Sequence, residues 1–578
     1  MGPRPCLPYL REVANRRFDG GFSHTNYNLT KYQYHGGIKI KNRESIENKK
    51  TGFMHGVIVL MFSQVIIKVV GLIYKLYLTN REGFGDKGNA IYSSGFQIYA
   101  LFLTICSIGV PNAISKLVSG KVAIGDNRGA YRIFKIAIAL FGTLGFAGSS
   151  VLFLGAKYIS NIYLQIPEAE MTLLAISPSV FLVSIASVLR GYFNGKENLS
   201  VTANSQSLEQ VFKTIFTILI VEQLASISTN NTILMAGGAT IATTLATLCS
   251  VIYLYKYFIK RKRNMWQEVI SSTINKKESV GRIIKNILIV SVPIALCALF
   301  SAMTKTIDAL TVVRILKTYI GEKEATIQYG ILSGKVDTLI TLPFSFNIAF
   351  ATALVPTISG AIARKEMDIV KKRIKFSILV TILIGIPCSV CMSIYSNQIL
   401  DLLFPNASAG GEMLKYSAWT IIFVVLTQTI NGALQGLGKV NVPVIAFAIG
   451  AVIKLILNIN LIPIIGVKGA IISSIISNAV SFIICLVVLK RNINIKFEKD
   501  KFLLKPLMAS ILMTVISYSF YNVLHKALSS AITLILSLLL AGIIYIILLL
   551  CFKVLSKEEI SMIPYGQKVY RNINKRKK

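Results

Sequence analysis

Long hydrophobic runs separated by short polar connections dominate the chain. The run from Ile532 to Cys551 carries no charged residue, and about 20 apolar residues let a helix cross a bilayer core. Only helices and closed barrels satisfy every backbone group in lipid, and these runs are too long for barrel strands. The pattern predicts an all-α polytopic membrane protein of about 14 transmembrane helices. The predicted spans are 56–78, 91–118, 132–157, 171–193, 200–222, 232–257, 283–312, 327–357, 374–396, 412–434, 441–463, 467–489, 503–524 and 530–553.

Two short motifs recur, which indicates that half of the chain is duplicated. Val110–Ser115 (VPNAIS) is echoed by Val355–Ser359 (VPTIS), and Arg190–Lys196 (RGYFNGK) by Asn431–Leu437 (NGALQGL). The first pair is offset by 245 positions and the second by 241. Transporters built from duplicated apolar halves place their site where the halves meet. We expect two six-helix lobes with two extra helices at the C-terminal end.

These boundaries give a domain plan. The polar, basic residues 1–53 are expected to be a disordered cytoplasmic tail, or to lie upstream of a true start at Met54. The remaining segments are the N-lobe with spans 1–6 (54–257), a cytoplasmic linker (258–282), the C-lobe with spans 7–12 (283–490), spans 13 and 14 (491–555), and a basic cytoplasmic tail (556–578).

Composition and charge agree with a membrane location. Hydrophobic residues make up 53% of the 578 residues and charged residues 15%, against about 25% charged in soluble domains. The net charge of +36 follows the even-numbered connections, as in Lys260–Arg263, whereas the connection 157–170 has Lys157 alone as its basic residue. By the positive-inside rule both termini are cytoplasmic in the plasma membrane. This distribution argues against nucleic-acid binding.

Ionisable residues inside spans are costly and usually face a bundle interior or a wet cavity. Two sets have the spacing of pairs on one helix face: Glu209 with Lys213, and Lys305 with Asp308. Such pairs have either a structural role or a coupling role. Lys213 and Lys454 are 241 positions apart, so a lysine recurs at one depth in both halves.

Lys68 lies deep in span 1 and has no acid nearby in the sequence, and Lys75 lies near the outer end of that span. Lys68 is a candidate cavity cation, whereas Lys75 is either a second one or an interfacial anchor. A cavity with excess cations selects anions such as phosphates and diphosphates. No residue of span 7 aligns securely as a basic counterpart of Lys68.

Sequence signatures of catalysis are absent. The chain contains no GxxxxGK[ST], HExxH or GxSxG sequence, so we expect neither an enzyme nor a cofactor. Transport would then draw on a coupling ion, Na⁺ or H⁺, or on the membrane potential.

The repeated motifs also indicate where helices pack closely and where they bend. Gly191/Gly195 and Gly432/Gly436 have the GxxxG spacing that permits close helix packing. Pro111 and Pro356 lie late in spans 2 and 8, where proline kinks a helix. Each kink is either a hinge or inherited shape.

Several of these motifs resemble a known family. Lys68–Gly71 (KVVG), Val110–Lys116, Arg190–Gly195, Tyr329–Gly334 (YGILSG) and Leu354–Ser359 look like the stage V sporulation protein B group of polysaccharide transporters. That group belongs to the multidrug/oligosaccharidyl-lipid/polysaccharide (MOP) exporter superfamily and is close to the MurJ-type flippases. The similarity covers about 55–555.

The resemblance implies alternating access and a lipid-linked diphosphate sugar as cargo. Lys68 and Lys75 match basic cavity positions of span 1, and Asp337 falls near an acidic position of span 8. Thr338 and Gln97 stand where MurJ-type proteins have arginines, so Lys335 becomes the candidate cation of span 8.

We therefore expect a flippase for an undecaprenyl-diphosphate-linked glycan, a lipid II-like cell-wall or spore-cortex precursor. The expected protein is a monomer, and cell-wall synthases are candidate partners. Three alternatives stay open: a flippase for O-antigen or teichoic-type repeat units, a cation-coupled multidrug antiporter, and a non-transporting scaffold for wall assembly.

Overall fold

Contacts within the chain separate Met1–Thr51 from Gly52–Lys578, and every described residue belongs to the second unit. The predicted tail, Pro356 and most of the C-terminal tail lie outside the described residues. The computed structural model describes residues 63, 66–104, 109–227, 231–272, 278–344, 347, 351, 354–355, 358, 361–362, 365–495 and 497–556.

The first half begins with a helix described over 66–80. Side-chain hydrogen bonds cap the N-termini of two later helices. Asp126 accepts one from the Gly129 amide at the start of α5, and Asn231 accepts one from the Ile233 amide at the start of α8. The helices that follow are α3 (Gly85–Thr104), α4 (Val110–Ala123), α5 (Asn127–Tyr158), η2 (Ile159–Leu164), η3 (Pro167–Ala169), α6 (Glu170–Gly195), α7 (Leu199–Ile227) and α8 (Thr232–Ile270).

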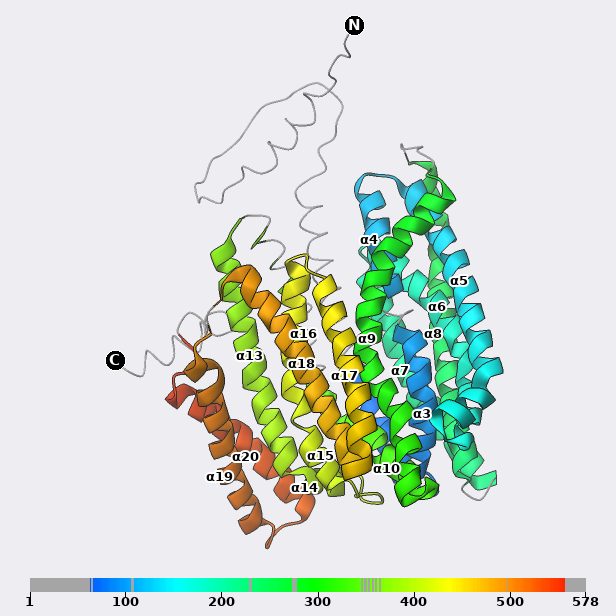
Figure 1. The fold of residues 1–578 in the computed structure, drawn as a ribbon. Helices are drawn as coiled ribbons and strands as arrows, with labels where there is room; N and C mark the ends of the chain where they lie inside the picture. Colours follow the sequence, from blue (N-terminus) through cyan, green and yellow to red (C-terminus); the bar gives the residue numbers. More distant parts are fainter. Residues whose placement is uncertain are drawn as a thin grey trace. The chain divides into compact units, whose positions relative to one another are not determined.

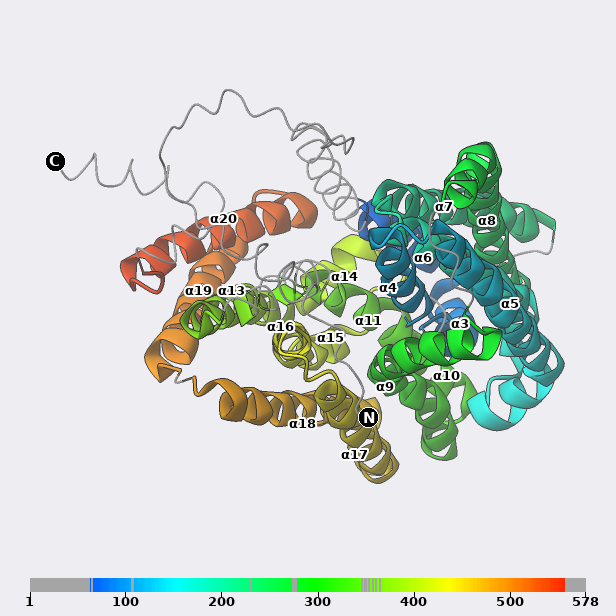
Figure 2. The same cartoon turned by 90° about the horizontal axis from the view of Figure 1, so that it is seen from above.

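The second half repeats this plan, and its helical segments follow one another without a gap from Glu322 to Ile340, where span 8 is expected to begin. Its helices pack in the order α13, α16, α18, α17 and α9, and Figure 2 shows them beside the α3–α8 group. Their bounds are α9 (Val280–Ile320), α10 (Glu322–Gly330), η4 (Ile331–Val336), α11 (Asp337–Ile340), α13 (Met367–Ile394), α14 (Ser396–Leu403), α15 (Gly411–Ser417), α16 (Thr420–Gly436), α17 (Asn441–Ile465) and α18 (Val467–Ile493).

A final hairpin lies outside the repeat. After η5 (Asp500–Leu504), α19 (Lys505–Leu524) packs against α20 (Ser530–Cys551), and α19 also packs against α13. The hairpin therefore attaches to the second half, at the left of Figure 1.

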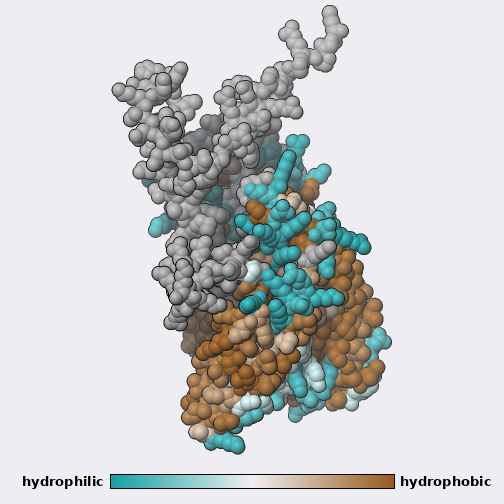
Figure 3. All heavy atoms as spheres, turned by 90° about the vertical axis from the view of Figure 1, so that its left-hand side faces the viewer, coloured by the Kyte–Doolittle hydropathy of each residue, from teal (hydrophilic) through white to brown (hydrophobic). Residues whose placement is uncertain are grey.

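The predicted all-helical membrane fold is confirmed, because the described residues form helices without a strand. Eleven of these helices are long and apolar enough to cross a membrane. The predicted spans 56–78, 91–118 and 327–357 each include residues outside the described ranges, so the total of fourteen stays a prediction. Figure 3 shows a hydrophobic belt with most of the hydrophilic atoms above it.

The linker between the halves is partly helical. The helix α8 continues to Ile270, and its 39 residues extend about 58 Å, well beyond a bilayer core of about 30 Å. Arg128 donates to the carbonyls of Val269 and Ile270, which fixes the end of α8 to the start of α5. The residues 260–263 of this extension are basic and exposed, and we call this side of the bundle the basic end.

The duplicated glycines allow the same close packing in both halves. A Cβ on Gly191 would lie 2.9 Å from the Pro111 backbone, and one on Gly195 would lie 2.7 Å from Val118. In the second half, a Cβ on Gly432 would lie 2.5 Å from the Ala351 carbonyl oxygen, and one on Gly436 would lie 2.8 Å from Ile358. The helix of span 4 or 10 thus meets the helix of span 2 or 8 backbone to backbone.

Candidate functional site

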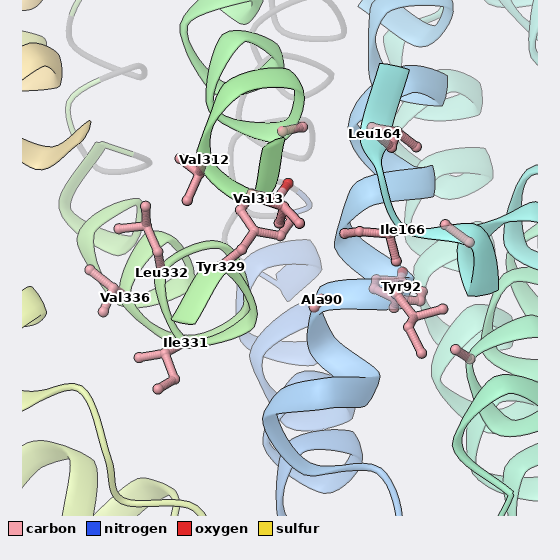
Figure 4. Close-up of a cluster of buried hydrophobic side chains, with 14 of the residues drawn as sticks. Ala90, Tyr92, Leu164, Ile166, Val312, Val313, Tyr329, Ile331, Leu332 and Val336 are labelled. Atoms are coloured by element: carbon pink, nitrogen blue, oxygen red, sulfur yellow. The ribbon is translucent and has the colours of Figure 1, made fainter. Parts of the chain in front are cut away.

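The two halves meet tightly at the end of the bundle opposite the basic end. Gly330 and Gly334 face α3 there, and a Cβ on Gly330 would lie 1.9 Å from the Asp86 carbonyl oxygen. Buried side chains of α3, α9 and α10 form one apolar cluster, which includes Ala90, Val313 and Tyr329 (Figure 4). We call this region, formed by residues 79–92, 325–336 and 403–407, the closed end.

An ion pair between the halves completes the closed end. The Lys335 ammonium donates to Asp86 Oδ2 at 3.0 Å and to the Ala407 carbonyl at 2.6 Å, and the lysine is fully buried. Asn80 Nδ2 donates to the Leu403 carbonyl at 2.8 Å. Lys335, predicted to be a cavity cation, therefore holds the halves together in this conformation.

Two pockets flank this contact, with volumes of about 440 and 640 Å³. Arg81 lines both of them, and its guanidinium donates to both oxygens of Glu222 at 3.0 Å. Hydrogen bonding to this carboxylate raises the pKa of Arg81 above its usual value. Arg81 is consequently a fixed cation beside the closed end.

Lys68 lies on the first helix and is exposed. The charged group that acts on it most strongly is Lys305 of α9, in the other half. Lys305 is itself partly exposed and forms an ion pair with Asp337 of α11 at 3.4 Å. The sequence shows no secure basic partner of Lys68 in span 7, whereas the structure brings Lys305 near it.

Lys75 and Lys213 occupy an aromatic site within the first half. Lys75 Nζ lies 5.0 Å from the centre of the Tyr92 ring, and Lys213 Nζ lies 4.8 Å from those of Tyr74 and Phe96. Both lysines are buried, at 6% and 8% exposed. Neither forms an ion pair within the described ranges. The reading of Lys75 as an interfacial anchor does not fit this burial.

The repeated lysine of the second half has a different environment. Lys454 Nζ donates to Asp308 Oδ2 at 2.6 Å and to Ser474 Oγ at 2.7 Å, and Asn458 Nδ2 donates to Asp308 Oδ1 at 3.0 Å. The expected pairing of Lys305 with Asp308 is therefore wrong in this structure. A buried carboxylate needs a cation in direct contact, and for Asp308 that cation is Lys454 of α17.

The expected pairing of Glu209 with Lys213 is also not observed. Glu209 instead accepts from Arg190 Nη2 at 2.7 Å, and Arg190 Nε donates to Ser205 Oγ at 2.9 Å. Arg190 is a further buried charge that was not expected from the sequence, because it lies at the predicted end of span 4. Its position beside Gly191, inside a repeated motif, is the signal that could have identified it.

The described residues contain no group of three His, Cys, Asp or Glu that could hold a metal ion. The candidate site consists of lysines, their acids and aromatic rings. Lys68 is exposed and Lys305 partly exposed, Lys335 is fully buried at the closed end, and Lys75, Lys213 and Lys454 are buried within the halves.

Comparison with known proteins identifies the family. The family model for the lipid II flippase MurJ matches residues 168–542, more than half of the chain. Stage V sporulation protein B of Bacillus subtilis (strain 168) is 25% identical over 526 residues, which cover 89% of this chain and 98% of that protein. Lipid II flippase MurJ of the same organism is 25% identical, covering 77% of this chain and 84% of that protein.

A solved structure shows the same fold. The structure of lipid II flippase MurJ in an inward closed conformation superimposes with a TM-score of 0.62 at 14% identity, over 85% of this chain and 98% of that one. The resemblance read from the repeated motifs is thereby confirmed, and the chain belongs to the MurJ family of lipid II flippases.

Proposed function

We propose that this protein moves an undecaprenyl-diphosphate-linked glycan across the plasma membrane by alternating access between its two halves. The exposed Lys68 and its neighbour Lys305, in the other half, carry the proposal. Two ammonium groups that repel each other, neither of them buried, attract an anion whose charge is spread over several oxygens, and a diphosphate is such an anion.

The charges of the loops support one orientation of the protein in the membrane. The basic end is placed in the cytoplasm by the positive-inside rule, with both termini there. The closed end then faces outward, and the Lys335–Asp86 pair keeps the outer side shut. In this state the diphosphate enters from the inner leaflet and meets Lys68.

Asp337 gives Lys305 a partner while the site is empty. Their 3.4 Å pair is partly exposed, so it is held weakly. A diphosphate competes with Asp337 for Lys305 and so joins the first half to the second. The membrane potential is one energy source, since each charge moved is worth about 2.3 kcal/mol per 100 mV.

Family membership and the Stage V sporulation protein B relative support a wall precursor of the lipid II type, used in the cell wall or the spore cortex. A multidrug antiporter for organic cations is less well supported. Its binding acids would be Glu209, Asp308 and Asp337, and each of these is paired with a cation.

The test is Lys68→Ala in cells that depend on this copy. We expect the lipid-linked precursor to accumulate inside, with at least a ten-fold loss of headgroup exposed outside, about 1.4 kcal/mol of lost transition-state binding. Lys68→Arg should retain most of the activity, because it keeps the charge. Lys157→Ala removes an exposed lysine of α5 and serves as the control.

Normal headgroup exposure in Lys68→Ala cells, at wild-type protein level, would contradict the cavity role. If Lys305→Ala is also silent while deletion of the basic loops abolishes growth, the non-transporting scaffold becomes the better account.

A further inference from the structure

The Lys75–Lys213 site holds two lysine amines, and neither forms an ion pair with a carboxylate of the described residues. Both amines contact the Tyr92 ring, with Lys213 Nζ 6.0 Å and Lys75 Nζ 5.0 Å from its centre. Ring faces compensate a desolvated ammonium only in part, because removing each charge from water costs several times what a ring returns. The site therefore favours a state in which only one of the two amines is charged.

Lys213 is the amine better placed to keep its charge. Three aromatic rings surround it, those of Tyr74, Tyr92 and Phe96, whereas Lys75 contacts Tyr92 alone. The charged and titratable groups acting on Lys75 come from four elements. They are Tyr74 on its own helix, Lys213 on α7, Asp86 on α3 and Asp337 on α11.

The two acids that act on Lys75, Asp86 and Asp337, each form an ion pair with a lysine of the second half. Asp86 is paired with Lys335 at 2.8 Å, and Asp337 with Lys305 at 3.4 Å. Asp86 belongs to the same half as Lys75, whereas its partner Lys335 belongs to the other. When the closed end opens, Asp86 therefore loses Lys335 and stays on the same half of the protein as Lys75.

We infer that Lys75 is a proton-binding site that couples transport to the proton gradient, with Asp86 exchanging Lys335 for Lys75 as the closed end opens. The inference rests on the proposed flippase function and names its coupling ion. On opening, the Lys75 amine takes one proton from the outer water and becomes an ammonium paired with the Asp86 carboxylate. On closing, Lys335 reclaims Asp86, and Lys75 releases that proton toward the inner side.

This sequence makes the protein a proton antiporter. Lys335 keeps its proton throughout, because opening exposes it to water while closing returns it to Asp86 and the Ala407 carbonyl. One proton moves inward in each cycle that carries a glycan outward. Opening of the closed end becomes easier as the pH falls, since it consumes a proton.

The experiment measures opening without cargo. Spin labels are attached at Glu82→Cys, in the closed end, and at Lys323→Cys, two residues before its segment 325–336. Both positions are exposed and lie in opposite halves, and the full-length chain is otherwise cysteine-free and held in lipid nanodiscs. Distances between the labels are recorded from about pH 6 to about pH 9. We expect the fraction with long distances to rise as the pH falls.

Variants identify the group responsible. Lys75→Met should stay closed and lose the pH response, and Lys75→Arg, permanently charged, should open at every pH. Lys213→Met should move the midpoint of opening to higher pH, because the repulsion that opposes protonation of Lys75 is gone. Lys157→Met, which removes an exposed lysine of α5 in the same half and outside the closed end, is the control and should respond as wild type does.

Two results would overturn the inference: a wild-type protein whose distances ignore pH, or a Lys75→Met protein with the wild-type response. If Lys75→Met does not fold, Lys75→Arg replaces it as the test, and a Lys75→Arg protein with the wild-type pH response would overturn the inference. Because no glycan is present, a negative result leaves the flippase proposal intact, and failure of the Lys68→Ala test leaves the pH result to be judged on its own.

Discussion

At the scale of residues, the pair of Lys454 and Asp308 shows how a buried charge is tolerated in the second half. Lys454 is 1% exposed, and its ammonium is held by one carboxylate and one hydroxyl. Removing one partner of such a pair leaves an uncompensated charge in a low-dielectric interior.

We predict that Lys454→Met lowers the free energy of unfolding by about 3–5 kcal/mol. The double variant Lys454→Met/Asp308→Asn should recover most of the loss, because neither remaining group is charged. Lys468→Met removes a lysine from an exposed pair with Glu412 and should have little effect. Denaturant unfolding of the purified protein measures all three, and equal losses for Lys454→Met and Lys468→Met would refute the assignment.

Sequence spacing identified the buried lysines but not their partners. Lys335 and Asp86 are 249 positions apart, and Lys454 and Asp308 are 146 apart. An oppositely charged residue three or four positions away stabilises a helix by only about 0.2–0.5 kcal/mol. Burying an ion costs several kcal/mol, so the ion needs a partner that offsets this larger cost. Tertiary contacts therefore override the local pairing expected for Glu209 and Lys305.

At the scale of elements, the glycine motifs fix how α6 and α16 approach their neighbours. Gly191→Ala and Gly432→Ala would each press a methyl group against backbone atoms closer than 3 Å. We predict a loss of about 1–3 kcal/mol for each, as in other overpacked cores. Gly142→Ala in α5 has nothing within 4 Å of its Cβ and should be neutral or slightly stabilising.

Thermal unfolding of the three variants in one detergent checks this prediction. Similar midpoints for Gly191→Ala and Gly142→Ala would mean that the close approach is not maintained in solution. The spacing of these glycines was readable in the sequence because the motif recurs. The helix that each glycine contacts was not readable, because Pro111 and Ala351 lie about 80 residues before Gly191 and Gly432.

The bounds of other elements were less predictable. Hydropathy ends span 6 near residue 257, but α8 continues to Ile270 because Arg128 and the Tyr131–Trp266 ring contact hold its polar extension. Helix termini beyond the membrane depend on such contacts, which leave no hydrophobic pattern.

At the scale of the whole molecule, the two halves share a scaffold and differ in charge. The repeated lysine pairs with an acid in the second half, whereas in the first half it lies among aromatic rings beside another lysine. Lys68 and Lys305, one from each half, add two cations that are not buried. The anionic cargo and the proton counter-flow that we propose both draw on this excess of positive charge.

The most direct test uses the purified protein in liposomes that contain a fluorescent undecaprenyl-diphosphate disaccharide peptide. A membrane-impermeant quencher reports how much headgroup crosses to the far leaflet. We predict that wild-type protein moves the headgroup and that Lys68→Ala/Lys305→Ala, inserted to the same level, moves at least ten-fold less. Equal movement by the two proteins, or none by the wild type under an inward proton gradient, would contradict the account.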